Sequence, residues 1–208
     1  MTIESALDDG IAAMGIALQA AQSGRLIAYL RLLEKWNRVH NLTAVREPGQ
    51  MVARHLLDSL SLLPHVAGAR SLVDVGTGAG LPGIPLAIAR PELAVTLLDA
   101  NHKKATFLRQ AKAELGLGNA DIVCERVEKY RPPETFDLVV SRAFAELADF
   151  VTQSHHLAGA GGLLLAMKGV HPFEEIARLP ATHRVEQVIA LRVPTLDAQR
   201  HLVFLKAA

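Results

Sequence analysis

One stretch of the 208-residue chain decides the fold: SLVDVGTGAGLPG, at residues 71–83. Ser71 to Val75 is a short apolar run, rich in β-branched residues and closed by Gly76, which is typical of a buried strand. The spaced glycines that follow permit close backbone approach, and the segment from about Leu81 to Ala89 favours a helix. The stretch therefore predicts a strand, a tight glycine-rich loop and a helix.

The pattern continues toward the C-terminus as alternating strands and helices. Asn101 is a candidate N-cap for a helix that extends through Leu115, and Gly116 is placed to end it. Further strands are predicted at 94–98, 121–124, 136–140 and 163–167, a further helix at 146–157, and a closing strand pair at 185–193 and 202–205. Such alternation is typical of an α/β fold with a doubly wound, mostly parallel sheet, here with antiparallel closing strands.

The first 65 residues contain only helical patterns, in three apolar stripes. Ser23-Gly24 stands between the first two stripes as a predicted break, and Glu47-Pro48 has the form of a helix start, because proline is tolerated in the first turn. The stripes comprise Ile3, Leu7, Ile11, Met14 and Leu18; Leu26, Leu30, Leu33 and either Trp36 or Asn37; and Val52, Leu56, Leu60 and Leu63. We predict an N-terminal helical segment at 1–69, packed on an α/β domain at 70–208.

The composition is that of a chain with a large core. Half of the residues are hydrophobic, and the formal net charge of +1 neither indicates nor excludes nucleic acid as a partner. No apolar run reaches the roughly 18 residues that a membrane helix needs. Cys124 is the single cysteine, which excludes an internal disulfide and is typical of a reducing compartment. We expect a cytoplasmic monomer that does not contact a membrane.

The register of the glycines distinguishes two kinds of ligand. A dinucleotide-binding loop has the pattern G-x-G-x-x-G, starting at the glycine that ends the strand. Counted from Gly76, the third glycine position holds Leu81, so the pattern fails. A second match at 78–83 fits the spacing but starts two residues too late. The order DVGTGAG at 74–80 instead resembles the first motif of class I methyltransferases, whose loop approaches the methionine part of S-adenosylmethionine.

Asp99 lies where the second predicted strand ends. An acid at this place can accept hydrogen bonds from the ribose hydroxyls of a nucleoside ligand. The alternative is structural, with Asp99 only capping the helix that begins near Lys103. The neighbouring glycine loop favours the ligand role, so the loop and Asp99 together predict a nucleoside-containing ligand.

Several separate segments form a combination that is more specific than any one of them. They are Trp36-Asn37, Asn41-Leu42-Thr43, Arg54-His55-Leu56-Leu57-Asp58-Ser59, the run from Asp74 to Pro85, Leu97-Leu98-Asp99, Arg126-Val127-Glu128, Ser141-Arg142-Ala143-Phe144-Ala145 and Lys168-Gly169. This combination, which extends from about Leu30 to Gly169, resembles the RsmG (GidB) family of bacterial 16S rRNA guanine-N7 methyltransferases.

The resemblance implies a class I methyltransferase (Rossmann-like) domain that transfers methyl from S-adenosyl-L-methionine to N7 of guanine 527 in 16S rRNA. The partner is then 16S rRNA or the small ribosomal subunit. Carried over by position, cofactor binding is assigned to Gly76 and Leu81 in the loop, Val127 and Glu128 after the third strand, and Arg142 after the fourth. The glycine motif and the strand-end position add Asp74, Gly78, Gly80 and Asp99 as cofactor-binding candidates.

The implied chemistry suits a chain without an acid–base signature. Guanine N7 carries an in-plane lone pair and no proton, so its methylation requires alignment of the reactants and no general base. Arg142 and Phe144 are therefore assigned to substrate positioning, with Phe144 stacking on a flipped guanine and Arg142 spanning cofactor and substrate. The alternative for Phe144 is a core aromatic. No His or Cys spacing indicates a metal site.

Candidate RNA contacts are Lys103, Lys104 and Arg109, on a helix expected to begin at the cofactor edge, together with Arg54. His55 and Asp58 stand one helical turn apart and are a candidate pair.

Three rival interpretations stay open. A nucleotide-dependent oxidoreductase is disfavoured by the glycine register. A non-catalytic RNA-binding or assembly protein is disfavoured by the intact loop, Asp99 and Arg142. A methyltransferase with another substrate remains, because only the family resemblance selects guanine N7 and 16S rRNA.

Overall fold

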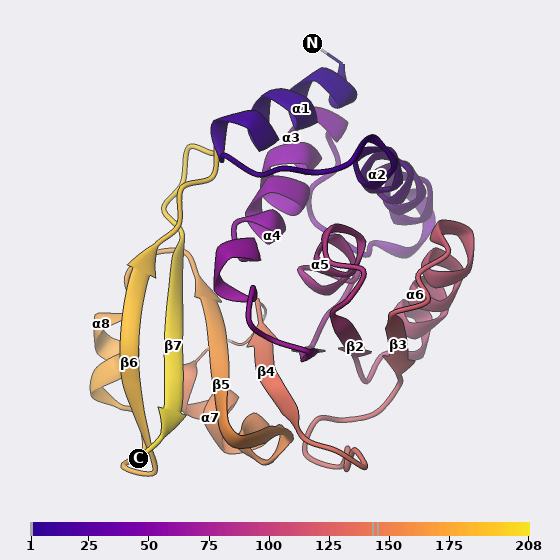
Figure 1. The fold of residues 1–208 in the computed structure, drawn as a ribbon. Coiled ribbons are helices and arrows are strands. Elements are labelled where there is room, and N and C mark those ends of the chain that lie inside the picture. The colour runs from indigo at the N-terminus through magenta and orange to yellow at the C-terminus, as the bar shows by residue number, and fades with distance from the viewer. Residues whose placement is uncertain (1, 143, 145) are drawn as a thin grey trace.

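The computed structural model describes residues 2–142, 144 and 146–208. Within these residues a seven-stranded sheet of order β3-β2-β1-β4-β5-β7-β6 is covered by helices (Figure 1). Strands β1 to β5 pair in parallel, and β7 is antiparallel to both β5 and β6. The elements are α1 (Ile3–Ala13), α2 (Ala20–His40), α3 (Pro48–Met51), a π-helical turn (Val52–Leu57), α4 (Asp58–Leu60), a 3₁₀ turn (Leu63–His65), β1 (Ser71–Val75), α5 (Gly83–Ala89), β2 (Ala94–Leu98), α6 (His102–Leu115), β3 (Ala120–Val123), β4 (Phe136–Ser141), α7 (Leu147–Ser154), a second 3₁₀ turn (His155–Leu157), β5 (Ala158–Lys168), α8 (Phe173–Ala177), β6 (His183–Ala190) and β7 (His201–Ala207).

The predicted fold class is confirmed, and β1 and β2 begin and end at the predicted residues. The predicted cap of α6 is also confirmed, since the Asn101 side chain accepts from the backbone N–H groups of Lys103 and Lys104. Gly116 ends this helix in the left-handed conformation, at φ 63°. β5 starts earlier than predicted, at Ala158, because its glycine-rich beginning already pairs with Phe136 of β4.

Alternate residues of the strands enter two different cores. Val73, Val139 and Leu164 pack with Leu147 and Phe150 of α7. Their chain neighbours Leu72, Leu138 and Leu165 belong to the other core, with side chains of α1, α2, α5 and α6. Because side chains of a strand point to opposite faces in turn, both faces of the sheet are buried. The division into units at 69/70 stays a prediction, since this second core joins residues from both sides of it.

The predicted break at Ser23-Gly24 is wrong, because α2 runs through it and the chain leaves helix at 14–19 instead. A helix-interior glycine costs about 1 kcal/mol, which tertiary contacts can outweigh. Gln22 supplies one such contact, since its Nε2 donates to the Ala89 carbonyl at 2.9 Å. Its Oε1 also accepts locally from the Gln19 amide at 2.8 Å and so helps to cap the start of α2. The predicted third helix start, with proline at its first turn, is confirmed.

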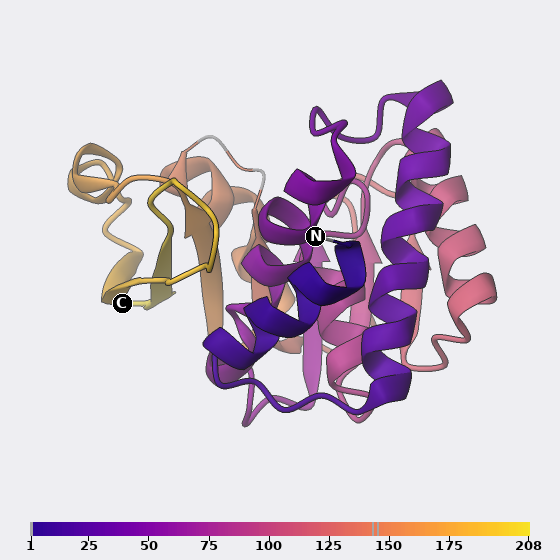
Figure 2. The same ribbon diagram turned by 90° about the horizontal axis from the view of Figure 1, so that it is seen from above.

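The helices of residues 3–65 gather over one face of the sheet, and the β6–β7 hairpin lies at the far end from α6 (Figure 2). The helix predicted at 146–157 is α-helical only to Ser154, and α8 was not predicted from the sequence. In the parts of the chain that the structure describes, no helix is long and apolar enough to span a bilayer.

Candidate functional site at the carboxyl edge of the sheet

The loop between β1 and α5 has left-handed backbone at alternate positions. The φ angles are 67° at Gly76, 62° at Gly78 and 92° at Gly80, where residues with a Cβ are strained. The amides of Gly76 and Thr77 donate to the Leu98 carbonyl oxygen at 2.9 and 3.1 Å. These bonds hold the loop between the ends of β1 and β2, the sheet edge at which open α/β folds bind ligands.

The space around the glycines differs along the loop. A Cβ on Gly80 would overlap the Ile84 side chain, and a Cβ on Gly83 would overlap Leu97. A Cβ on Gly78 would meet no heavy atom nearer than 3.9 Å. Gly80 and Gly83 are therefore required by the packing of the loop and α5, while a Cβ at Gly78 would make only ordinary van der Waals contacts.

Asp74 stabilises the loop through hydrogen bonds to its side-chain carboxylate. Its side chain is fully buried, and Oδ2 accepts from Thr77 Oγ1 at 2.6 Å and from the Gly83 amide at 2.8 Å. Burial raises the pKa of this carboxyl to about 6, against the lowering effect of the two hydrogen bonds. Asp74 Oδ1 has no hydrogen-bond partner among the described residues. The geometry makes Asp74 a support of the loop, and its predicted contact with a ligand stays a prediction.

Asp99 joins the loop to the start of α6. Its Oδ2 accepts from the Gly78 amide at 2.9 Å, its Oδ1 accepts from the Asn101 amide at 2.8 Å, and Lys104 Nζ lies 3.5 Å from Oδ2. The helix cap that was the alternative role for Asp99 belongs to Asn101. Asp99 is therefore left at the sheet edge, with its carboxylate beside the loop.

Tyr29 supports the loop from the N-terminal helices. Its hydroxyl donates to the Ala79 carbonyl at 2.7 Å, and its ring is buried 6.5 Å from the Phe107 ring. Burial raises the pKa of the Tyr29 phenol. The N-terminal helices therefore help to position the loop, although no sequence motif indicates this contact.

A cavity of about 240 Å³, the glycine-loop cavity, lies between the ends of β1, β2 and β4. Five predicted site residues line it: Gly76, Asp99, Val127, Glu128 and Phe144. The other wall residues are Val75, Leu98, Ala100, Glu125 and Arg126. Leu81, also a predicted cofactor contact, is only 4% exposed and packs in the core, and its amide donates to the Thr77 carbonyl at 3.0 Å. Its contact with a ligand stays a prediction.

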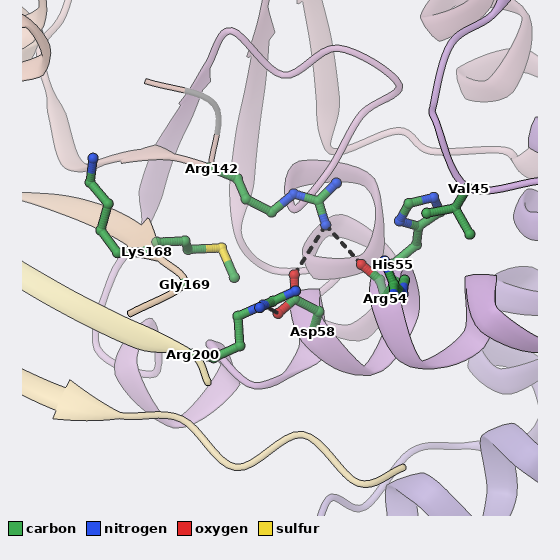
Figure 3. Close-up of a pocket in the computed structure, with 9 residues that line it drawn as sticks. Val45, Arg54, His55, Asp58, Arg142, Lys168, Gly169 and Arg200 are labelled. Carbon is green, nitrogen blue, oxygen red and sulfur yellow. Dashed lines mark hydrogen bonds and ion pairs between the residues drawn. The ribbon is translucent and has the colours of Figure 1, made fainter. Parts of the chain in front are cut away.

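A second cavity of about 350 Å³, the arginine cavity, lies beside the ends of β4 and β5. Its walls are Val45, Arg54, His55, Asp58, Arg142, Met167, Lys168, Gly169 and Arg200. At its centre Asp58, with a side chain 2% exposed, accepts from Arg142 Nη1 at 3.1 Å and from Arg200 Nε at 2.8 Å. Figure 3 shows the two arginines reaching the carboxylate from separate segments, while Lys168 points away from it. The cavity thus has two guanidinium groups paired with one buried carboxylate, and Arg54 and Lys168 also line its walls.

His55 does not pair with Asp58, contrary to the sequence-based pairing. Its Nε2 lies 3.0 Å from Thr43 Oγ1, and its Nδ1 has no hydrogen-bond partner among the described residues. The π-helical turn at 52–57 changes the angular spacing that the pairing assumed. Burial, with the positive charge of Arg142, lowers the pKa of His55 to about 4, so the ring is neutral near pH 7.

Arg142 and Phe144 line different cavities. Arg142 lines the arginine cavity, and its Nη1 also donates to the Arg54 carbonyl at 3.1 Å. Phe144 lines the glycine-loop cavity and packs 5.4 Å from the Phe150 ring. Ala143 and Ala145 of the same family motif lie outside the described residues. The roles predicted for Arg142 and Phe144 stay predictions.

Of the predicted RNA contacts, three lie on α6 and one lines the arginine cavity. Lys103 and Arg109 are exposed on α6, and Lys104 is held beside Asp99. Arg54 is exposed at the arginine cavity. Arg200 was missed by the sequence analysis, because nothing in the sequence indicates that the segment before β7 returns to Asp58. Among the described residues, no group of three or more His, Cys, Asp or Glu side chains could hold a metal ion.

This fold occurs in solved methyltransferase structures. TomG, an O-methyltransferase from Streptomyces achromogenes solved in complex with SAM, aligns with a TM-score of 0.59 at 15% identity over 100% of this chain and 99% of that one. The mitomycin 7-O-methyltransferase MmcR aligns with a TM-score of 0.63 at 17% identity, over 77% of this chain and 56% of that one. The chain therefore has the fold of the class I methyltransferases.

The chain belongs to the rRNA small subunit methyltransferase G family, whose model matches residues 22–203. Two relatives carry the name ribosomal RNA small subunit methyltransferase G. The one from Laribacter hongkongensis is 56% identical over 203 residues, which cover 98% of each chain. The one from Nitrosospira multiformis is 54% identical over 209 residues, covering 97% of this chain and 96% of the relative. The predicted family is confirmed, and the match extends beyond both ends of the motif region.

Proposed function

We propose that this methyltransferase transfers a methyl group from S-adenosylmethionine to N7 of guanine 527 in 16S rRNA. The observation that carries the proposal is the placement of two cavities at one sheet edge. One is bordered by a methyltransferase-type glycine loop with its acid, and the other is rich in arginine. The names of the relatives and the family support small-subunit rRNA as the substrate.

The glycine-loop cavity suits the nucleoside part of S-adenosylmethionine. Each carboxylate oxygen has two lone pairs, so the Asp99 carboxylate can accept from ribose hydroxyls in addition to its two backbone donors. Gly78 has no side chain, so a ligand can approach the loop backbone closely at this position. Val127 and Glu128 form the opposite wall, where the family resemblance assigns the adenine. When bound, S-adenosylmethionine supplies an electrophilic methyl carbon on a sulfonium.

The protein's own contribution is orientation, because N7 has no proton to remove. The buried groups near the arginine cavity agree with this chemistry. His55 is neutral with a pKa of about 4, and the Asp58 carboxylate is occupied by two guanidinium groups. The arginines would hold the phosphates around the target nucleotide, so that N7 faces the methyl carbon.

The test offers the purified protein S-adenosylmethionine labelled in the methyl group, with small-subunit particles, naked rRNA and a protein substrate in parallel. We expect label in RNA and a single cleavage at guanine 527 after m7G-selective strand scission. Label only in protein, or RNA label at another atom, would overturn the proposal.

A matched pair of variants tests whether the glycine-loop cavity binds S-adenosylmethionine. Asp99→Ala removes the carboxylate beside the loop, and we expect it to weaken S-adenosylmethionine binding at least about 10-fold, the loss of one charge-assisted hydrogen bond. Asp121→Ala is the control, because this aspartate is 84% exposed on β3 and forms a surface ion pair with Lys112. Equal affinities of the two variants would contradict the assignment of Asp99.

A further inference from the structure

An exposed aromatic stack lies beside the arginine cavity. Phe173 is 73% exposed and is one of three large hydrophobic side chains on the described surface with such exposure. One face of its ring is covered by His171, with ring centroids 3.8 Å apart and planes 27° from parallel. The segment that carries both follows directly on Lys168 and Gly169, which line the cavity.

The stack has a rigid base. The His171 ring meets the His201 ring edge-on at 5.4 Å, and His201 Nδ1 lies 2.8 Å from the Gly169 carbonyl oxygen. His201 is opposite Lys168 in the β5–β7 ladder and next in sequence to Arg200, which holds Asp58. The stack is therefore attached to the same strands that form the wall of the arginine cavity.

Distance and charge both connect the stack to the cavity. Phe173 is four residues from Gly169, so the two Cα atoms are at most about 14 Å apart. The acidic residues after Phe173 are compensated, since Glu175 pairs with Lys168 at 2.7 Å and Glu174 with Arg178 at 3.2 Å. The net charge near the stack is thus the positive charge of the arginines, which favours a polyanionic partner over a basic or neutral one.

We propose that Phe173, backed by His171, is a stacking platform for a base of the RNA strand whose phosphates enter the arginine cavity. Unpaired bases stack on exposed aromatic rings with little sequence preference, while a neighbouring cationic groove follows the backbone. Phe173 therefore positions the strand that flanks the target nucleotide. This assignment rests on the proposed function for its substrate class but concerns residues that have no part in cofactor binding.

The test compares four variants on naked rRNA and on small-subunit particles. Phe173→Ala should raise KM for RNA about 10-fold, within the range measured for the loss of one stacked base, with the S-adenosylmethionine Kd unchanged. Phe173→Trp should restore KM, because it keeps an aromatic face, whereas Phe173→Leu should not. Val170→Ala is the matched control, since Val170 is 70% exposed on the same segment.

The outcomes separate the platform from the reaction. If Phe173→Leu retains the wild-type KM, or Phe173→Ala loses activity on particles but not on naked rRNA, the platform contacts something other than a base and the assignment fails. Binding of an rRNA fragment with 2-aminopurine beside the target gives an independent readout, with fluorescence quenched by the wild type and not by Phe173→Ala. Quenching without methyl transfer by the wild type would overturn the proposed reaction and keep the platform.

Discussion

The two cavities at the sheet edge are built in opposite ways. The glycine-loop cavity is lined by four short runs, each of which ends or closely follows one of the strands β1 to β4, and backbone hydrogen bonds hold the loop at its edge. The arginine cavity collects side chains from five separate parts of the chain, from Val45 to Arg200, around the buried carboxylate of Asp58. The residues of the first cavity can therefore be located from the ends of predicted strands, whereas those of the second are brought together only by the way distant segments meet.

The two cavities should also respond to substitution in different ways. Backbone conformation at the loop depends on the absence of side chains, so substitutions there introduce strain and overlap. The arginine cavity depends on charge pairing at a buried group, so substitutions there leave charges unpaired. Damage to one cavity should accordingly leave the other intact, and the following predictions test that independence.

The largest effect is expected at Gly80. Gly80→Ala combines strain at φ 92° with overlap against Ile84, and we expect a loss of roughly 3 kcal/mol in the free energy of unfolding together with loss of cofactor binding. Gly78 also has a positive φ, of 62°, but a Cβ there would meet no heavy atom nearer than 3.9 Å, so for Gly78→Ala a loss of roughly 1 kcal/mol is expected. Urea unfolding of both variants measures the contrast, and equal losses would contradict the role of packing.

The next largest effect on stability is expected from substitution of Asp58. Asp58→Ala leaves Arg142 and Arg200 without their shared partner, and we expect a loss of about 2 kcal/mol, less than for a fully buried pair because both guanidinium groups are partly exposed and can be hydrated. KM for RNA should rise while the S-adenosylmethionine Kd stays constant, as measured by steady-state kinetics and calorimetry. A comparable loss of cofactor affinity would show that the cavities are not independent.

His55 should make the stability depend on pH. Its pKa of about 4 in the folded chain lies below the usual 6.5, so protons bind preferentially to the unfolded state between these values. Stability is therefore complete above about pH 6.5 and is lost as the pH falls toward 4, by about 2 kcal/mol at pH 5.

Comparison with His55→Gln by urea unfolding at pH 7 and pH 5 isolates this effect. The raised pKa of Asp74 acts in the opposite direction, since that carboxyl favours the folded state on protonation, but it is common to both proteins. The wild type should lose more stability than the variant on acidification. An equal loss in both would exclude His55 as the cause.

The smallest effect on stability is expected at Arg54, which is exposed. Arg54→Ala should change the free energy of unfolding by less than about 0.5 kcal/mol, yet lower RNA affinity and reduce the salt dependence of binding by about 0.7 in logarithmic slope. Arg31→Ala is the control, since Arg31 is exposed on α2 and pairs with Glu4. If the salt slopes of the two variants agree, Arg54 does not contact a phosphate.

The parts of the fold that sequence predicted are those governed by short-range physics. The positions of β1 and β2, the Asn101 cap and the Gly116 end of α6 each depend on residues within a few positions of one another. The predicted helix break at Ser23-Gly24 was wrong, because a distant contact from Gln22 to the end of α5 outweighs the local free-energy cost of a glycine within a helix.

The sequence by itself determined the class of fold, the family and the residues that border the glycine loop, because a strand, its glycines and the following acid are read from adjacent positions. Only the tertiary structure decided that Asp58 holds Arg142 and Arg200, that His55 bonds Thr43 instead, and that Phe173 remains exposed beside them. These contacts join residues that are far apart in the chain or displaced by a π-helical turn, so they follow from the packing of elements and not from any spacing along the sequence.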